Sequence, residues 1–449
     1  MATAARRLAQ EVLVRVAADA AYGERALHAA LDRTCLEERE RALVTELVYG
    51  TLRHQLSLDA ALGAHLSQPL RKLPPPVLAA LRLGAYQLIH TRVPPHSAVH
   101  ESVDLVRRRF GRLGGVVNAV LRKVAGAQCD AAPPEAVPAD PVAELALTGS
   151  HPTWLVEELL GRWDADEVRA FMDANNARAP LSLRVNRRRS SRAEVVALLR
   201  ESGRQVQLCE ALEDGLLVPK PGKVKALPGF AEGLYTVQDM AATLVGLWAA
   251  PVPGSIVLDA CAAPGGKSTH LAELMGDEGV VVATDVHPAK MRLIAGNAER
   301  LGLEAVRPRV ADAQDGAALA AVLAAEGLSQ VDLAVLDAPC SGLGTLRRNP
   351  ELRHRTRASL QSLVALQARL LGAVAPLVRP GGALLYAVCT LTEAEGPAQV
   401  QRFLAAHPAF RVAPPRAALA PWTEGPFLRT YTHRHGTDSF FAARLEKIA

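Results

Sequence analysis

Residues 255–269 read SIVLDACAAPGGKST, an apolar run followed by a loop that contains Gly-Lys-Ser, as an ATP-binding P-loop does. The P-loop pattern requires its first glycine five positions before Gly266, and Cys261 occupies that position. The spacing therefore disfavours ATP binding. The adjacent glycines, Gly265 and Gly266, predict instead a loop whose backbone approaches a nucleoside at the N-terminus of a helix.

The same pattern, an apolar run that ends in a loop with Asp or Cys, recurs from about residue 237 onward with helical segments in between. Such alternation predicts a doubly wound, mostly parallel α/β sheet. The carboxyl ends of parallel strands meet at one edge of a sheet, so we expect these polar residues to share a ligand site. The runs are SIVLDA (255–260), VVVATD (280–285), VRPRVAD (306–312), DLAVLDAP (332–339) and ALLYAVC (383–389).

Two of these aspartates are placed where an adenosine-containing ligand would need them. Asp285 follows Gly266 by 19 residues, the usual spacing of an acidic residue that binds ribose hydroxyls, and Asp312 is expected on the adenine side. This arrangement fits a dinucleotide or S-adenosylmethionine. The dinucleotide pattern G-x-G-x-x-G is absent, which favours S-adenosylmethionine and leaves an NAD-dependent oxidoreductase as the weaker alternative.

Cysteines mark the fourth and fifth predicted strands, as Cys340 in LDAPCSGLGTLRRNPE (336–351) and Cys389 in YAVCTLTEAEG (386–396). A single cysteine here would more often be a buried packing residue. Two of them beside a cofactor loop indicate methylation of cytosine at C5, in which a thiolate adds to C6 and activates C5. Asp337 would contact the N3/N4 edge of the base. By analogy with DNA cytosine methyltransferases, the residues alone favour Cys340 as the nucleophile.

The chain before this region has a different character. Residues 1–127 have apolar residues at helical spacing and hold 18 Lys and Arg against 11 Asp and Glu, whereas the whole chain holds 51 against 46. This excess indicates either RNA binding or a solvated surface rich in arginine. A Pro- and Ala-rich stretch predicts a linker over 128–149, and mixed patterns predict a small α+β module over 150–236.

The amino-acid composition indicates the class of protein and argues against several kinds of site. The chain has 449 residues, of which 49% are hydrophobic and 22% charged, typical of a soluble protein with several domains. Its six cysteines form no CxxC pair, which argues against a zinc site or a disulfide framework. The first residues lack the features of a signal peptide. We therefore expect a cytoplasmic monomer that binds neither metal nor membrane.

With these motifs in place, the sequence resembles the RNA cytosine-C5 methyltransferases of the Sun/Nop2 type, and most closely the bacterial small-subunit rRNA members with a NusB-like N-terminal domain. The resemblance implies an all-α NusB-like RNA-binding domain over 1–127, a small α+β RNA-binding module, and a Rossmann-like class I methyltransferase domain over 237–449. It also implies S-adenosylmethionine as cofactor and 16S rRNA as substrate. The matching segments are HPTWLVEELL, PLSLRVN, VQDMAA, DACAAPGGK, DAPCSGLGTLRRNPE, the Cys389 motif and DSFFAARL.

The resemblance also implies roles for individual residues. Cys389 would be the nucleophile, Cys340 would assist release of the 5-methylcytosine product, and Asp337 would lie between cofactor and base. Asp285 would hold the ribose and Asp312 the adenine side. The cofactor loop would comprise Cys261, Ala262, Ala263, Pro264, Gly265, Gly266 and Lys267.

Two positions near the proposed nucleophile depart from the family pattern, and LRHRTR (352–357) stands where a tryptophan is common, which concerns an RNA contact and not the chemistry. Val388 stands where a threonine usually precedes the nucleophile, and Gly396 stands where an asparagine usually follows Glu395. These departures motivate an alternative function, an RNA-binding ribosome assembly factor with weak or no turnover. Candidate phosphate contacts are VRRRFGR (106–112) and the pair Arg347 and Arg348.

Overall fold

The computed structural model describes residues 2–19, 23–129, 140–210 and 212–448. They form two compact units. Unit 1 comprises Met1–Arg178 together with the short segment Leu346–His354, and unit 2 comprises Ala179–Thr345 and Arg355–Ala449.

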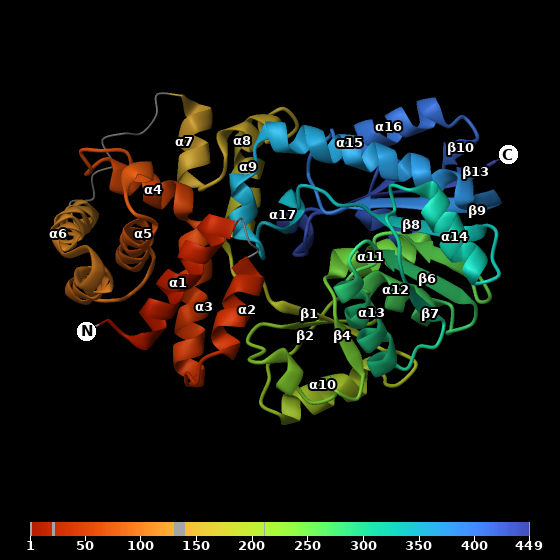
Figure 1. Cartoon of the computed structure of the whole chain (residues 1–449), viewed down its shortest axis with the longest axis horizontal. Coiled ribbons are helices and arrows are strands. Elements are labelled where there is room, and N and C mark those ends of the chain that lie inside the picture. The colour runs from red at the N-terminus through yellow and green to blue at the C-terminus, as the bar shows by residue number, and fades with distance from the viewer. Residues whose placement is uncertain (1, 20–22, 130–139, 211, 449) are drawn as a thin grey trace. The chain divides into compact units, whose positions relative to one another are not determined.

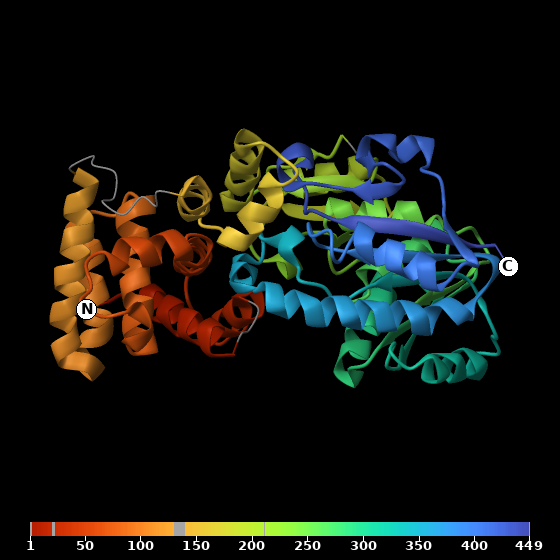
Figure 2. The same cartoon turned by 90° about the horizontal axis from the view of Figure 1, so that it is seen from above.

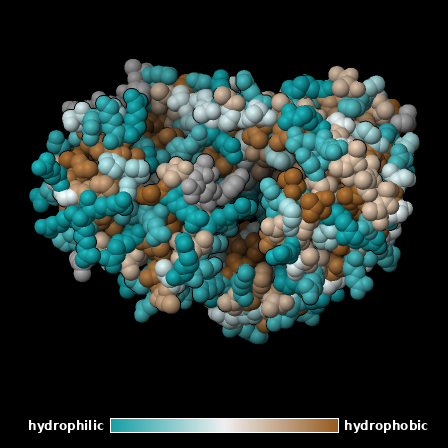
Figure 3. Space-filling model, viewed as in Figure 1, coloured by the Kyte–Doolittle hydropathy of each residue, from teal (hydrophilic) through white to brown (hydrophobic). Residues whose placement is uncertain are grey.

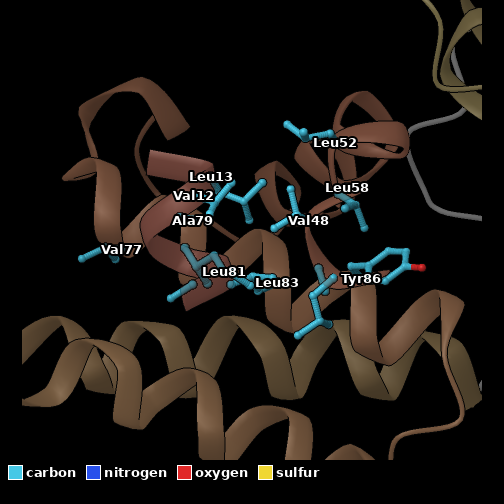
Figure 4. Close-up of a cluster of buried hydrophobic side chains, with 14 of the residues drawn as sticks. Val12, Leu13, Val48, Leu52, Leu58, Val77, Ala79, Leu81, Leu83 and Tyr86 are labelled. Carbon is cyan, nitrogen blue, oxygen red and sulfur yellow. The ribbon is translucent and has the colours of Figure 1, made fainter. Parts of the chain in front are cut away.

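Unit 1 is helical, as the apolar spacing predicts. Prolines occupy the first turns of α5 and α6, where their missing N–H groups cost nothing. Side chains from α1, α3, α4 and α5 point into one apolar core, which Figure 4 shows for Val12, Val48, Leu58 and Leu81. The helices are α1 (Ala4–Asp19), α2 (Gly23–Asp32), α3 (Glu38–Arg53), α4 (Gln55–Gly63), α5 (Pro75–His90), α6 (Pro95–Cys129, with a kink at Phe110), α7 (Pro141–Thr148), α8 (Thr153–Leu160) and α9 (Ala165–Asn176).

The predicted linker 128–149 is only partly an irregular segment. Residues 130–139 lie outside the described residues, and α6 continues to Cys129. The end of the range is the helix α7, because the Asp140 side chain accepts a hydrogen bond from the Val142 N–H and Pro141 takes the first helical position. Compact packing also groups α8 and α9 with unit 1, so the predicted module 150–236 is divided between the units.

The first part of unit 2 is a four-stranded antiparallel sheet in the order β2-β3-β1-β4. Helix α10 (Arg192–Glu201) packs its apolar face on this sheet, and a capping box between Ser191 and Glu194 begins the helix. The strands are β1 (Leu181–Val185), β2 (Gln207–Leu208), β3 (Gly215–Val218) and β4 (Tyr235–Val237).

The larger sheet confirms the predicted Rossmann-like architecture. Strands β7, β6, β5, β8 and β9 are parallel neighbours in that order, and β13 continues the sheet antiparallel to β9. The strands are β5 (Ile256–Asp259), β6 (Val280–Asp285), β7 (Val306–Val310), β8 (Val331–Asp337), β9 (Val378–Val388), β10 (Phe410–Val412), β11 (Thr423–Glu424), β12 (Phe427–Arg429) and β13 (Phe441–Lys447).

Helices cover both faces of this sheet, as Figure 1 shows. Successive strand residues such as Val257 and Leu258 enter different core clusters, because side chains alternate along a strand. One cluster contains α11, α12 and α13, and the other contains α14, α15 and α16. The helices are α11 (Met240–Ala249), α12 (Gly266–Leu274), α13 (Pro288–Leu301), α14 (Gly316–Ala325), α15 (Arg357–Val374), α16 (Pro397–Ala406) and α17 (Thr432–His435).

Helix α15 has the composition of a membrane span but the surroundings of a core helix. In the described part of the chain, the segment Arg357–Leu377 is long and apolar enough to cross a membrane. However, Leu370 and Leu371 pack into the core of the large sheet, and the buried Gln367 donates a 3.0 Å hydrogen bond to the Pro339 carbonyl. Figures 1 and 2 show α15 lying along the sheet with α16 beside it.

Candidate active site

The predicted cofactor loop joins the end of β5 to α12. Its backbone is tied to the neighbouring strand by the Ala262 N–H, which donates to the Thr284 carbonyl at 2.8 Å. Gly265 has φ +98°, and a Cβ there would lie 3.1 Å from Ile294 Cα. Only glycine adopts this conformation at such a close approach. The loop therefore presents the N-terminus of α12 at the carboxyl edge of the sheet.

Asp259, at the end of β5, is a buried residue of this loop that sequence reasoning did not single out. Its Oδ2 accepts a 2.6 Å hydrogen bond from the Ser268 hydroxyl. Burial raises the pKa of Asp259 to about 6. Its Oδ1 has no hydrogen-bond partner among the described residues. The pattern of apolar runs ending in Asp was the signal that would have identified it.

Lys267 and Asp337 form the charged centre of the site. The Lys267 Nζ lies 2.6 Å from the Asp337 Oδ2 and 5.2 Å from the centre of the Phe440 ring. Burial lowers the pKa of Lys267, but the charge and hydrogen bond of Asp337 outweigh burial and leave the pKa raised. Lys267 is therefore a cation held between the cofactor loop and the end of β8.

The other predicted cofactor residues occupy neighbouring strand ends. The Asp285 carboxylate, at the end of β6, contacts the Lys290 Nζ at 3.1 Å and accepts from the His287 N–H at 3.0 Å. Asp312, two residues beyond β7, is exposed, and its carboxylate accepts from the Gln314 N–H at 2.9 Å. Burial raises the pKa of the Cys261 thiol, so this cysteine stays neutral.

The two predicted catalytic cysteines lie next to each other. Strands β8 and β9 pair in parallel, and the loops that follow them bring the Cys340 Sγ within 3.3 Å of the Cys389 Sγ. The hydrogen bond to Cys389 and burial both raise the pKa of Cys340. A neutral Cys340 thiol can therefore donate a hydrogen bond to the Cys389 sulfur. Negative charge on Cys389 would also be attracted by the nearby Lys267 ammonium.

A buried carboxylate, Glu395, holds the two cysteine loops together. Next to Cys340, the Ser341 N–H and hydroxyl donate to Glu395 at 2.8 and 2.6 Å. Next to Cys389, the Thr390 hydroxyl donates to the same carboxylate at 2.8 Å. Gln367 on α15 adds a hydrogen bond of 3.0 Å. In the sequence, Glu395 is distinguished only as the residue before Gly396, and the residues around it do not indicate these hydrogen-bond partners.

The two departures from the family pattern have structural settings. The Val388 side chain is fully buried in the apolar core of the large sheet. At Gly396, an added Cβ would lie 3.0 Å from the Arg429 Nη1, a buried atom without a hydrogen-bond partner among the described residues. Glycine thus leaves room for a buried guanidinium behind the Cys389 loop.

Helix α12 is bound to the small antiparallel sheet by an ion pair and a hydrogen bond. The residues that make these contacts were not predicted from the sequence. Arg184 on β1 is buried, forms an ion pair with Glu273 on α12, and donates to the Gln238 side chain at 2.5 Å. Gln238 in turn donates to the Gly266 carbonyl at 3.3 Å. Both ends of α12 are therefore tied to the small sheet.

A metal centre is not formed by the part of the chain that the structure describes, since it contains no group of three or more His, Cys, Asp or Glu side chains placed to hold an ion.

Comparisons with known proteins agree with this arrangement. Family models match the chain in three segments: NusB family over residues 3–126, a ferredoxin-like domain of RsmF/B-like methyltransferases over 151–225, and 16S rRNA methyltransferase RsmB/F over 246–446. The chain is 38% identical to a probable ribosomal RNA small subunit methyltransferase B of Synechocystis, with 99% of both chains covered. A protein of the same name from Bacillus subtilis is 33% identical, also with 99% of both chains covered. Among solved structures, the crystal structure of PH0851 is 28% identical and superposes with a TM-score of 0.83 over 100% of both chains.

Proposed function

The chain belongs to the RsmB/F family of 16S rRNA methyltransferases, and from this membership we propose that it transfers a methyl group from S-adenosylmethionine to C5 of a cytosine in 16S rRNA. The observation that carries the cytosine-C5 assignment is the 3.3 Å separation of the Cys340 and Cys389 sulfurs at adjacent strand ends. The Lys267–Asp337 ion pair lies at the same edge of the sheet. Covalent activation of a pyrimidine needs a thiolate at this place.

The residues around the cofactor loop fit S-adenosylmethionine. Gly265 and Gly266 open the N-terminus of α12 to a ligand, and beyond Gly266 the nearest atom to an added Cβ is the Gln238 Nε2 at 3.8 Å. Asp285 would accept from the ribose hydroxyls and Asp312 would lie on the adenine side. S-adenosylmethionine supplies an electrophilic methyl group on a sulfonium. Its positive charge would be placed near Asp337.

The chain's own residues account for the activation of cytosine. The Cys389 thiolate adds to C6, and the electron pair released into the ring makes C5 nucleophilic. After methyl transfer, the C5 proton passes to water, the electron pair of that C–H bond re-forms the C5–C6 double bond, and the thiolate leaves, which restores aromaticity and frees Cys389. The neutral Cys340 thiol stabilises the Cys389 sulfur by hydrogen bonding and would assist this expulsion. Asp337, which Lys267 contacts at 2.6 Å, would accept a hydrogen bond from the N4 amino group.

Exposed arginines on α6 are suited to contact rRNA phosphates. Arg107, Arg108, Arg109 and Arg112 are all solvent-exposed, as a phosphate contact requires. Hydrophilic side chains predominate on the face of unit 1 that Figure 3 displays. Such contacts give affinity without sequence choice, so we propose that selection of the target cytosine is made elsewhere.

The proposal is tested with purified protein, tritiated S-adenosylmethionine and small-subunit rRNA that lacks the modification. We expect label in 5-methylcytosine with the wild type and none with Cys389→Ala. With Cys340→Ala we expect a covalent protein–RNA adduct to accumulate. Wild-type turnover by Cys389→Ala would overturn the nucleophile. RNA binding without any transfer by the wild type would favour the assembly-factor function instead.

A further inference from the structure

A segment of nine residues directly after the Cys340 loop belongs to unit 1. The chain leaves unit 2 after Thr345, contributes Leu346–His354 to unit 1, and returns to unit 2 at Arg355. We call Leu346–His354 the clasp. Its apolar residues Leu346 and Leu352 are buried, and so is the guanidinium of Arg353, which is only 2% exposed.

Among the described residues, Arg353 is bound by the carboxyl ends of helices and not by a carboxylate. Its Nη1 donates to the carbonyl of Arg53, the last residue of α3, and to the Ser150 carbonyl beyond α7 at 3.0 Å. Its Nη2 donates to the Asn176 Oδ1 at the end of α9 at 2.8 Å. Helix C-termini carry partial negative charge, so three helices together stabilise this buried cation. Burial lowers the pKa of Arg353 to about 9, which still leaves it protonated at neutral pH.

Glu351, two residues earlier in the clasp, meets the opposite end of a helix. Its Oε1 accepts a 2.9 Å hydrogen bond from the N–H of Gly23, the first residue of α2. A helix N-terminus carries partial positive charge and favours a carboxylate. Glu351 and Arg353 are thus each matched to helix ends of unit 1, whereas Arg348 and His354 of the clasp are exposed.

Gly344, two residues before the clasp, is hydrogen-bonded to the backbone of Cys389, the proposed nucleophile. The Gly344 N–H donates to the Cys389 carbonyl at 3.0 Å, and the Gly344 carbonyl accepts from the Ser439 N–H at 2.8 Å. A Cβ at Gly344 would lie 1.8 Å from the Ser439 oxygen, so this contact leaves no free space. Thr345 alone separates Gly344 from Leu346. The backbone of Gly344 is therefore fixed to the backbones of Cys389 and Ser439.

We propose that the clasp makes the geometry of the Cys340–Cys389 pair depend on the helical unit, with Arg353 as the positioning residue. The packing of the clasp in unit 1 fixes where the Cys340 loop ends. The hydrogen bond from the Gly344 N–H to the Cys389 carbonyl then fixes the backbone of Cys389. The helical unit thereby acts on the reaction itself and does more than hold RNA. As far as methyl transfer is concerned, this inference rests on the proposed function.

The test compares Arg353→Gln with Arg33→Gln in the full chain. Arg33 is a matched control, because its exposed guanidinium also donates to a helix carbonyl in unit 1, that of Ala29 at 2.9 Å. Two quantities are measured: steady-state kinetics with rRNA, and the alkylation rates of Cys340 and Cys389 by iodoacetamide, resolved by mass spectrometry. For Arg353→Gln we expect kcat to fall by about tenfold to a hundredfold, because small displacements of reacting groups have such effects. The KM for S-adenosylmethionine should stay unchanged, and the alkylation rates of both cysteines should change.

A folded Arg353→Gln variant with wild-type kcat and wild-type alkylation rates would overturn the proposal and leave Arg353 a purely structural residue. If this variant does not fold, Glu351→Gln replaces it, because that change removes the charge at α2 and keeps the side-chain shape. If the wild type itself transfers no methyl group, the proposed function fails. The alkylation rates then still decide whether the clasp positions the cysteines.

Discussion

At the scale of single residues, Asp259 is a carboxyl group kept in the core of the large sheet at a cost in stability. Its pKa is raised by burial to about 6 from 3.8. A raised folded-state pKa contributes stability that is present below about pH 4 and lost as the pH rises through 6. Asp259→Asn keeps an acceptor for Ser268 without the charge. We expect it to raise the melting temperature of unit 2 at pH 7.5, with a gain of up to ~3 kcal/mol.

The pH dependence of that gain is the decisive observation. The difference in melting temperature between Asp259→Asn and the wild type should shrink on going from pH 7.5 to pH 4, where the wild-type carboxyl is protonated. Equal or lower stability of the variant at pH 7.5 would mean that Asp259 is held in its charged form by a favourable environment.

Glu395 is the second prediction at the residue scale. Glu395→Gln replaces one of two carboxylate oxygens, each of which accepts from at least two donors, with an amide nitrogen, so the buried donors on that side lose their acceptor. We expect a loss of about 2–4 kcal/mol in stability, because removing one buried partner strands the other. We also expect a lower kcat, because the cysteine loops separate. Calorimetry and methyl-transfer kinetics measure the two effects.

A nearby glutamate serves as the control. The Glu393 side chain lies two residues earlier in the same loop and is 51% exposed; its Oε1 lies 3.4 Å from the Arg429 Nη2, which keeps the Leu391 carbonyl as an acceptor at 3.0 Å when the charge is removed. Glu393→Gln should change the melting temperature little. Similar losses in both variants would show that the loop tolerates no charge change and that the Glu395 network has no special role.

At the scale of elements, α12 depends on the small antiparallel sheet for its position. Gln238→Leu removes the donor to the Gly266 carbonyl and leaves the buried Arg184 Nε without its acceptor. We expect the dissociation constant for S-adenosylmethionine to rise by about fivefold to tenfold, equivalent to ~1 kcal/mol for one hydrogen bond. Isothermal titration calorimetry measures this change. An unaltered affinity in a folded variant would mean that α12 is positioned by its own packing.

At the scale of the whole molecule, net positive charge is concentrated in residues 1–127, which hold 18 Lys and Arg against 11 Asp and Glu. Arg107→Gln and Arg112→Gln should each weaken rRNA binding and reduce the slope of log Kd against log salt by about one, since each removes one phosphate contact. The measurement is a salt titration of rRNA binding. Arg411→Gln is the control, because Arg411 pairs with Glu446 at 3.3 Å and should not affect the slope. Equal slopes for all variants would place the RNA contacts elsewhere.

The sequence by itself determined the architecture and the chemistry-bearing loops, because these depend on local patterns. Apolar runs ending at Asp285, Asp337 and Cys389 predicted the strand ends of a Rossmann-like sheet, and the structure confirms it. Because the carboxyl ends of parallel strands meet at one edge of a sheet, the same pattern predicted that Cys340 and Cys389 lie at that edge. The helical N-terminal region followed from apolar spacing in the same way.

Tertiary structure alone decided which side chains meet. The hydrogen bonds from Ser341 and Gln367 to Glu395, the ion pair from Arg184 to α12, and the binding of Arg353 at the end of α3 depend on contacts between residues far apart in the chain. The spacing of apolar residues predicts which face of a helix or strand is buried. It does not predict which polar group a buried polar side chain contacts. The clasp illustrates this limit, since its sequence indicated only that Arg347 and Arg348 could contact phosphates, and not that helix ends of unit 1 bind Glu351 and Arg353.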